Sequence, residues 1–164
     1  MVCPWADPQH FRSLDGIQRL ADQLNEADEV ARDHGLRLLY HNHDFEFIPW
    51  PDGSIPHRHL QQLTAPTVAF EIDTYWVKVA GSDPVEVVRD LGTRAPLLHI
   101  KDGHIDPIAP MLPIGDGAMD FPSILTAASA EWLIVEFDQC ATDIFEAVEK
   151  SFRYLVDKGL GRGK

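Results

Sequence analysis

Four carboxylate or imidazole side chains stand at the ends of strand-like segments of this 164-residue chain. Glu46 closes YHNHDFEF, Asp73 closes VAFEID, His99 lies within LLHIKD and Glu136 within WLIVEFD. One strand cannot close a metal site alone, but the same ends of neighbouring parallel strands can, and barrel enzymes place their chemistry there. The sequence therefore predicts a divalent-cation site formed by Glu46, Asp73, His99 and Glu136.

Three carboxylates and one imidazole form an oxygen-rich ligand set. Such a set suits Mn²⁺, our first expectation, and also Mg²⁺ or Co²⁺, better than a structural zinc, although Zn²⁺ stays an option. Each residue alone is more often a helix cap, a solvated charge or a core histidine, so the prediction rests on their combination. Glu136 adds an argument, because it lies among apolar residues, where an unpaired carboxylate would cost several kcal/mol and a cation would remove that cost.

Two further side chains could contact a substrate at the same site. Lys101 shares a strand face with His99 and would reach the same end of the sheet, unless it simply pairs with Asp102. Trp76, three residues after Asp73, could stack on the face of a sugar or could be an ordinary buried aromatic.

His41 and His43 also share one face of their predicted strand. Strand alternation places Glu46 on the opposite face, so either the histidines or Glu46 should enter the site, unless the strand bends near Asp44. We favour Glu46 as the ligand, with the two histidines contacting substrate or packing in the core.

Apolar periodicity and capping residues indicate strands that alternate with helices. The predicted strands cover residues 36–43, 67–73, 96–101 and 132–137, with a possible short one at 2–4, and the predicted helices cover 13–34, 57–63, 83–92, 120–130 and 143–159. This alternation predicts an α/β fold with a parallel sheet of βαβ units in one domain.

Composition narrows the possible partners. Twenty-six acidic against fourteen basic residues give a net charge of -12, which disfavours binding to nucleic acid or to an anionic membrane surface. The two cysteines, Cys3 and Cys140, form no CxxC pair, and the chain has neither a signal-peptide pattern nor an apolar run of about 20 residues. We therefore expect a soluble, cytoplasmic protein that acts on a small molecule.

Several segments together resemble the xylose isomerase-like TIM-barrel family of sugar-phosphate isomerases and epimerases. These segments are LLYHNHDFEF, FEIDTYWVKVAG, RAPLLHIKDG, PIGDGAMDF, WLIVEFD and SFRYL. The resemblance implies the Glu, Asp, His, Glu metal set at Glu46, Asp73, His99 and Glu136. Trp76 stands where ketose 3-epimerases have a histidine, which argues against that activity.

A complete (β/α)₈ barrel takes about 250 residues. The resemblance therefore implies that residues 1–164 are a single partial domain, the C-terminal half of a (β/α)₈ TIM barrel whose N-terminal strands are missing. Open sheet edges and an apolar inner face would favour a homo-oligomer. The residues expected on that face are Val68, Phe70, Ile72, Leu97, Leu98, Ile134 and Val135.

The resemblance implies a metal-dependent isomerase or epimerase that transfers a proton next to the carbonyl of a small ketose or cyclitol. Glu46 and Glu136 would take and return the proton through an enediolate. One alternative is an inosose dehydratase-type lyase, and another is a catalytically inactive sugar-binding remnant. An endonuclease of abasic DNA is disfavoured by the charge of -12.

Overall fold

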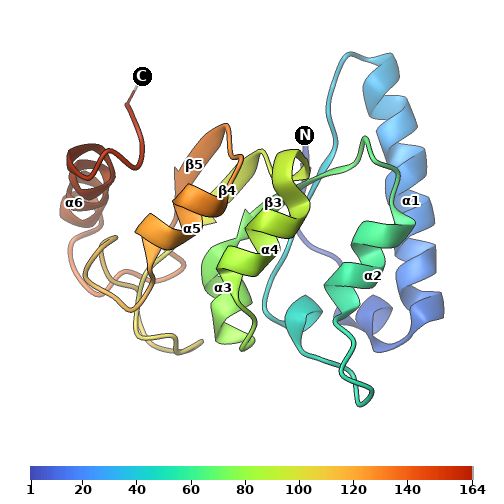
Figure 1. The fold of residues 1–164 in the computed structure, drawn as a ribbon, viewed down its shortest axis with the longest axis horizontal. Helices are drawn as coiled ribbons and strands as arrows, with labels where there is room; N and C mark the ends of the chain where they lie inside the picture. Colours follow the sequence, from blue (N-terminus) through green and yellow to red (C-terminus); the bar gives the residue numbers. More distant parts are fainter. Residues whose placement is uncertain (164) are drawn as a thin grey trace.

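A computed structural model describes residues 1–163 and contains one five-stranded parallel sheet (Figure 1). The strands are β1 (Val2–Cys3), β2 (Leu39–His41), β3 (Ala69–Asp73), β4 (Leu97–Ile100) and β5 (Trp132–Val135), and they pair in chain order. Every neighbouring pair is parallel. This arrangement confirms the predicted parallel sheet of βαβ units.

Helices connect the strands. They are α1 (Leu14–Asp33), α2 (Pro56–Leu63), α3 (Thr74–Val79), α4 (Pro84–Leu91), α5 (Phe121–Ala127) and α6 (Ile144–Asp157), with short 3₁₀ segments η1 (Pro8–Arg12), η2 (Phe45–Phe47) and η3 (Gly92–Arg94). The sequence did not predict α3, which starts directly after β3. In the part of the chain described here, no helix is long and apolar enough to cross a membrane.

Strand β2 is shorter than the predicted run of residues 36–43. It ends at His41, and Asp44 already has the helical backbone conformation that leads into η2. Strand alternation therefore stops before Glu46. The bend near Asp44 decides which side chains of this segment face the end of the sheet.

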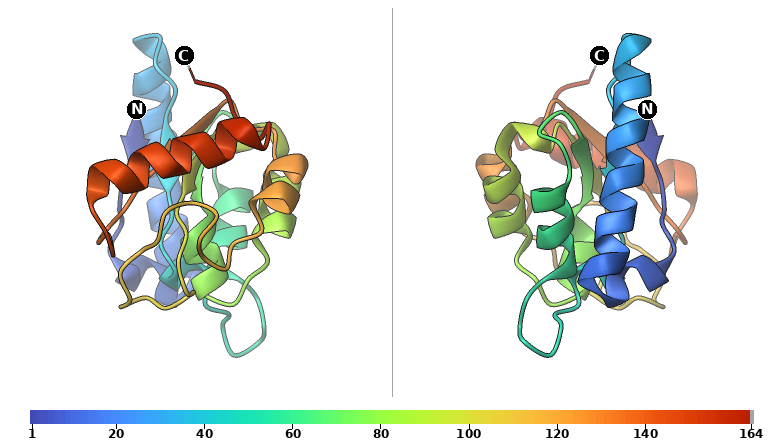
Figure 2. Two further views of the ribbon diagram at one scale, coloured as in Figure 1. Left: turned by 90° about the vertical axis from the view of Figure 1, so that its left-hand side faces the viewer. Right: turned by 90° about the vertical axis from the view of Figure 1, so that its right-hand side faces the viewer.

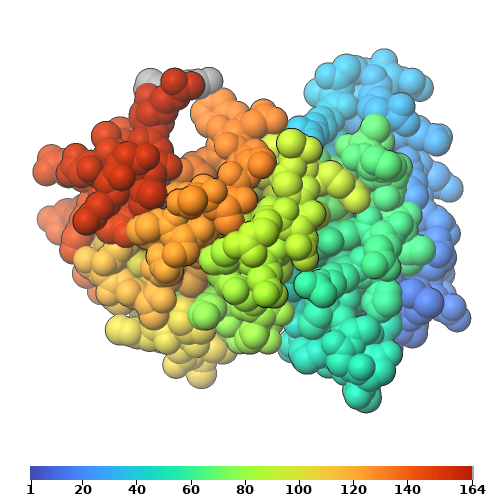
Figure 3. All heavy atoms as spheres, viewed as in Figure 1, coloured from blue at the N-terminus to red at the C-terminus, as the bar shows by residue number. Residues whose placement is uncertain are grey.

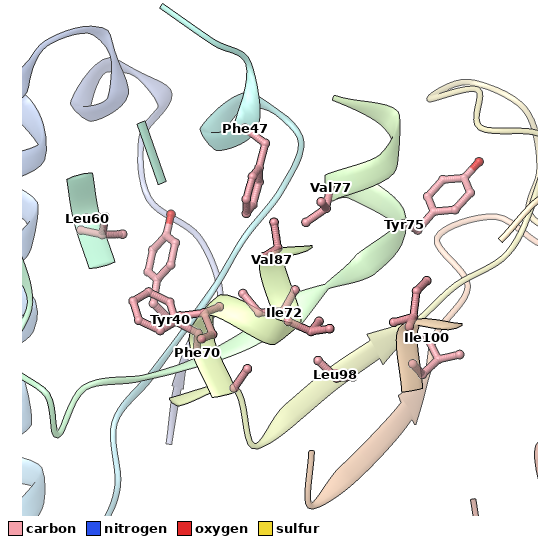
Figure 4. Packing of buried hydrophobic residues seen from close by; sticks show 14 of the residues in the cluster. Tyr40, Phe47, Leu60, Phe70, Ile72, Tyr75, Val77, Val87, Leu98 and Ile100 are labelled. Carbon is pink, nitrogen blue, oxygen red and sulfur yellow. The ribbon is translucent and has the colours of Figure 1, made fainter. Parts of the chain in front are cut away.

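The main core lies between the sheet and its helices. Phe70 and Ile72 of β3, together with Leu98 of β4, are fully buried in this cluster (Figure 4). The prediction that these three side chains lie on an open inner face is therefore wrong. The opposite face carries Glu71 and Asp73, because successive side chains of a strand point to opposite faces.

Several exposed apolar side chains lie at one end of the molecule, on α6. Phe145 is 82% exposed and Phe152 51% exposed, whereas Leu155 of the same helix is buried. Figure 2 (left) shows α6 lying across this end with none of the other described elements in front of it. A groove of about 630 Å³ separates α6, which is red in Figure 3, from α5 and β5, which are orange.

The loops that follow the strands gather along the lower edge of Figure 1. They include η2 after β2, α3 after β3 and the long segment 103–119 after β4. In parallel sheets ligands bind beyond the carboxyl ends of the strands, so this edge is where a site is expected.

Candidate metal centre

Three side chains from three neighbouring strands meet at the carboxyl end of the sheet. His41 ends β2, Asp73 ends β3 and His99 lies near the end of β4. One ligand atom of each lies within 4.8 Å of the ligand atoms of the other two. The parallel register brings them together, since Asp73 lies opposite His99.

Asp73 connects this group to the surrounding backbone. Its Oδ1 accepts a hydrogen bond from the backbone N–H of Trp76 at 2.9 Å, which caps α3. Its Oδ2 lies 3.1 Å from Lys101 Nζ and 3.8 Å from His99 Nδ1. The fully buried amide of Asn42 exchanges two hydrogen bonds with the backbone of Asp73 and so ties the ends of β2 and β3 together.

Glu136 directly follows β5 and adds a carboxylate beside His99. Its Oε2 lies 2.5 Å from His99 Nδ1 and 2.8 Å from Lys101 Nζ. Contact with His99 first, and with Lys101 second, outweighs burial and lowers the pKa of Glu136 to about 2. Glu136 is therefore ionised at neutral pH.

Lys101 is 2% exposed yet charged, because carboxylates surround it. Asp138 Oδ2 lies 2.9 Å from its Nζ, in addition to Asp73 and Glu136. Burial alone would lower the pKa of Lys101, but the three carboxylates outweigh burial and raise that pKa above its ordinary value. The indole ring of Trp76 lies 5.5 Å from the ammonium.

Glu71, two residues before Asp73, contacts both histidines. Its Oε2 lies 3.4 Å from His41 Nδ1 and 3.3 Å from His99 Nε2. Burial alone would raise the pKa of Glu71, but these contacts lower it to about 2. Burial would likewise lower the pKa of His99, whereas Glu136 and Glu71 raise it to about 9.

Glu46 does not join this group. Its side chain is fully buried, Oε1 accepts a hydrogen bond from Tyr40 Oη at 2.7 Å, and Oε2 accepts one from the His43 backbone N–H at 2.9 Å. Burial raises its pKa to about 7. Because β2 ends at His41 and the chain bends into η2, the structure brings His41, and not Glu46, beside Asp73 and His99. The arrangement thus differs from the one favoured from the sequence, in which Glu46 was the ligand and the histidines were not.

The other predicted substrate contact on this segment, His43, lies beside the group rather than in it. Its ring stacks on Phe45 at a centroid distance of 5.8 Å and meets the His41 ring edge-on at 5.2 Å. His43 and Trp76 are both partly exposed.

Several polar atoms of this centre have ion-pair partners but no hydrogen bonds of good geometry. Among the residues described, seven buried side-chain polar atoms have no hydrogen-bond partner, and four of them are His41 Nδ1, Asp73 Oδ2, His99 Nδ1 and Glu136 Oε2. Buried polar atoms are normally satisfied, so a cluster of unsatisfied ones indicates a missing ligand. Two imidazoles and two carboxylates are a donor set that divalent transition metals accept, so these residues fit a cation.

Asp102 organises the loop that follows β4. Its fully buried carboxylate accepts hydrogen bonds from four backbone N–H groups, those of Gly103, Gly115, Gly117 and Met119, at 2.9 to 3.1 Å. A Cβ atom on Gly117 would lie only 2.1 Å from Asp102 Oδ1. The glycine is thus required by the close approach of the backbone to this carboxylate.

Sequence reasoning missed Glu71, Asp138, Asn42 and Asp102. The sequence spacing could have indicated two of them, since Glu71 lies two residues before Asp73 and Asp138 lies two residues after Glu136. Side chains two apart in a strand share a face, so a second carboxylate beside each predicted ligand could have been expected.

Comparison with known proteins agrees with this geometry. The family profile described as "Xylose isomerase-like TIM barrel" matches residues 1–157. The chain belongs to this family. It is 31% identical to a sugar phosphate isomerase/epimerase from Parabacteroides distasonis, with a TM-score of 0.83, and the match covers 99% of this chain and 58% of that one. The shared fold is a TIM barrel, of which this chain forms a part.

Curated relatives at lower identity are inosose dehydratases. The enzyme of Clostridium beijerinckii is 22% identical over 96% of this chain and 60% of its own length. That of Lacticaseibacillus casei is 27% identical over 91% of this chain and 56% of its own length. The chain therefore spans somewhat more than half the length of the relatives it matches.

Proposed function

We propose that this chain carries the metal centre of an enzyme that transfers a proton at the carbon next to the carbonyl of a small ketose or cyclitol. The observation that carries the proposal is the meeting of His41, Asp73 and His99 at the carboxyl ends of three parallel strands, with ligand atoms within 4.8 Å of one another. Membership of a family of sugar isomerases and epimerases supports the substrate class.

In this proposal His41, Asp73, His99 and Glu136 hold one divalent cation, with Mn²⁺ as the first candidate. A bound cation would supply Lewis acidity, which polarises a substrate carbonyl and lowers the cost of removing the neighbouring proton by several kcal/mol. The ligand set differs from the one expected from sequence in a single position, where His41 replaces Glu46.

Glu136 is the proposed proton acceptor. Its side chain is 39% exposed and follows β5 beside His99, so it can reach a substrate held at this end of the sheet. Positioned acid-base catalysis of this kind contributes roughly 10²–10⁴-fold. Glu46 is not assigned the second proton transfer, because its two oxygens are engaged inside the protein.

Lys101, Trp76 and His43 are the proposed substrate contacts. Lys101 fixes the carboxylate of Glu136 through the 2.8 Å ion pair, and its ammonium, which also contacts Asp73 and Asp138, would meet a substrate bound against these carboxylates. Trp76 and His43 offer partly exposed rings on which the apolar face of a sugar can stack.

A lyase of the inosose dehydratase type is the second candidate, favoured by the curated relatives. It would use the same proton removal and then expel a β-hydroxyl. The two reactions differ in their product, because dehydration loses water and isomerisation does not. Mass spectrometry of the recovered product therefore distinguishes them.

Metal binding tests the ligand set. Isothermal titration with Mn²⁺ should give one site in the wild type, and Asp73→Ala, His99→Ala and His41→Ala should each lose it. Glu46→Gln, which alters a buried carboxylate outside the group, is the matched control and should bind normally. If the control loses the metal and His41→Ala keeps it, the ligand set expected from sequence is the correct one.

Proton exchange tests the chemistry. Incubation with Mn²⁺ and ketoses or inososes in D₂O should place deuterium next to the carbonyl, and Glu136→Gln should abolish this exchange. Metal binding without exchange on any of these substrates would instead favour the sugar-binding remnant.

A further inference from the structure

Glu71 has a position that no part of the proposed function uses. It lies on the same face of β3 as Asp73, one pair of residues further from the carboxyl end, and is 6% exposed. A single oxygen atom, Oε2, lies between the rings of His41 and His99, at 3.4 Å and 3.3 Å. A buried carboxylate thus connects two of the proposed ligands that come from the two strands flanking its own.

The ring nitrogens that face Glu71 indicate which nitrogen of each histidine stays available for a cation. Glu71 faces Nδ1 of His41 and Nε2 of His99. The other nitrogen of His99, Nδ1, faces Asp73 and Glu136. A neutral imidazole carries its proton on one nitrogen and can bind a metal through the other. Protons held toward Glu71 therefore leave His41 Nε2 and His99 Nδ1 available for a cation.

We propose that Glu71 is a positioning residue that fixes the tautomer and orientation of both histidine ligands by accepting an N–H from each ring on one oxygen. The inference rests on the proposed metal centre and goes beyond its ligand set. Carboxylates that accept the second N–H of a metal-bound histidine typically change metal affinity by about 10–100-fold. Glu71 acts on two ligands at once, so its loss should lie toward the upper end of that range.

At 3.4 and 3.3 Å the two contacts are slightly long, and His41 Nδ1 forms no hydrogen bond in this structure. Hydrogen bonds of functional sites are often long before a ligand binds and shorten afterwards. Glu71 could otherwise serve only as a structural ion pair or act as a ligand itself. A substitution that keeps the acceptor but removes the charge separates these roles.

The test compares Glu71→Gln with Glu71→Ala. A glutamine can place its carbonyl oxygen between the two rings but is a poor metal ligand, whereas alanine removes the acceptor. We expect Glu71→Ala to weaken Mn²⁺ binding by about 10–100-fold and Glu71→Gln to retain affinity within about tenfold of the wild type. Asp28→Asn, which changes a buried carboxylate of α1, is the control and should leave Mn²⁺ affinity unchanged.

Histidine nitrogen NMR gives a readout that a purely structural role would not move. In the Zn²⁺-loaded wild type, long-range ¹H–¹⁵N spectra should show His41 protonated at Nδ1 and His99 at Nε2. Glu71→Gln should preserve this pattern and Glu71→Ala should lose it for at least one ring. The opposite tautomers in the wild type, or equal losses of affinity in both variants, would overturn the inference.

The outcomes also separate this inference from the proposed function. If Asp73→Ala abolishes Mn²⁺ binding while Glu71→Ala binds like the wild type, the metal centre stands and the role of Glu71 is refuted. If the folded wild type binds no divalent cation, both fail. Circular dichroism of each metal-free variant establishes that affinity is measured on folded protein.

Discussion

His57 should make the stability of this protein depend on pH in a specific way. The residue lies in α2 with no exposed surface, and its ring stacks on Phe47 at 4.4 Å and meets Phe70 edge-on at 5.2 Å. Its Nδ1 lies 2.7 Å from Gln61 Nε2, whereas Nε2 has no hydrogen-bond partner. Burial lowers the pKa of His57 to about 3, since a charged ring would have no water around it.

Proton linkage sets the direction and the size of the change in the free energy of unfolding. Below pH 6.5 the unfolded chain binds a proton at His57 and the folded chain does not, so the free energy of unfolding falls as the pH falls, until about pH 3. Each unit of difference in pKa corresponds to about 1.4 kcal/mol. Between pH 7 and pH 5 the contribution of His57 amounts to a loss of about 2 kcal/mol.

His57→Phe isolates this contribution, because phenylalanine keeps an aromatic ring between Phe47 and Phe70 and cannot be protonated. Urea unfolding at pH 7 and at pH 5 should show that the wild type loses about 2 kcal/mol more stability than the variant. Other titrating groups affect both proteins equally and cancel in the difference. Equal losses in the two proteins would refute the reasoning and show that His57 takes up its proton in the folded state.

Three further predictions concern other regions. Gly117→Ala should lower the free energy of unfolding in urea by about 1–3 kcal/mol, because the new methyl group would collide with Asp102 Oδ1. A smaller destabilisation than that of Gly161→Ala would contradict this packing. Burial raises the pKa of Glu46 to about 7, so the unfolded chain loses this proton at a lower pH than the folded chain does. The free energy of unfolding of the wild type should therefore fall by up to about 3 kcal/mol as the pH rises from 4.5 past 7. Glu46→Gln should lack this loss in unfolding measurements at pH 5 and pH 8, and an unchanged loss would assign it to another group. The exposed apolar face of α6 should cause self-association that Phe152→Asp reduces, and sedimentation velocity showing monomers of the wild type at all concentrations would exclude it.

The secondary structure was largely predictable because its signals are local. Apolar periodicity placed α1 within one residue at each end, and the sequence Asp83-Pro84 located the start of α4. The short helix α3 was missed because the residue that caps it, Asp73, was assigned to the metal site alone. In the structure its Oδ1 caps α3, and its Oδ2 faces Lys101 and His99.

The composition of the site was less predictable because it depends on where β2 ends. Alternation along a regular strand left two exclusive possibilities, the histidines or Glu46, and only the backbone bend at Asp44 selects His41. Alternation also showed that Phe70 and Ile72 share a face without showing that this face meets the helices. The charges of Glu71 and Asp73 on the opposite face contained that information, since apolar side chains pack where carboxylates are absent.

The carboxylate of Asp102 has a consequence for how this protein can diversify. Four backbone N–H groups define the path of the loop after β4, and backbone groups are present whatever side chains the loop carries. Ile108, within this loop, is 85% exposed. Such an exposed residue can change without altering the path of the loop. The loop lies beside the strand ends that hold the candidate centre. The surface of this loop could therefore change by substitution while the strands that carry the candidate centre stay the same.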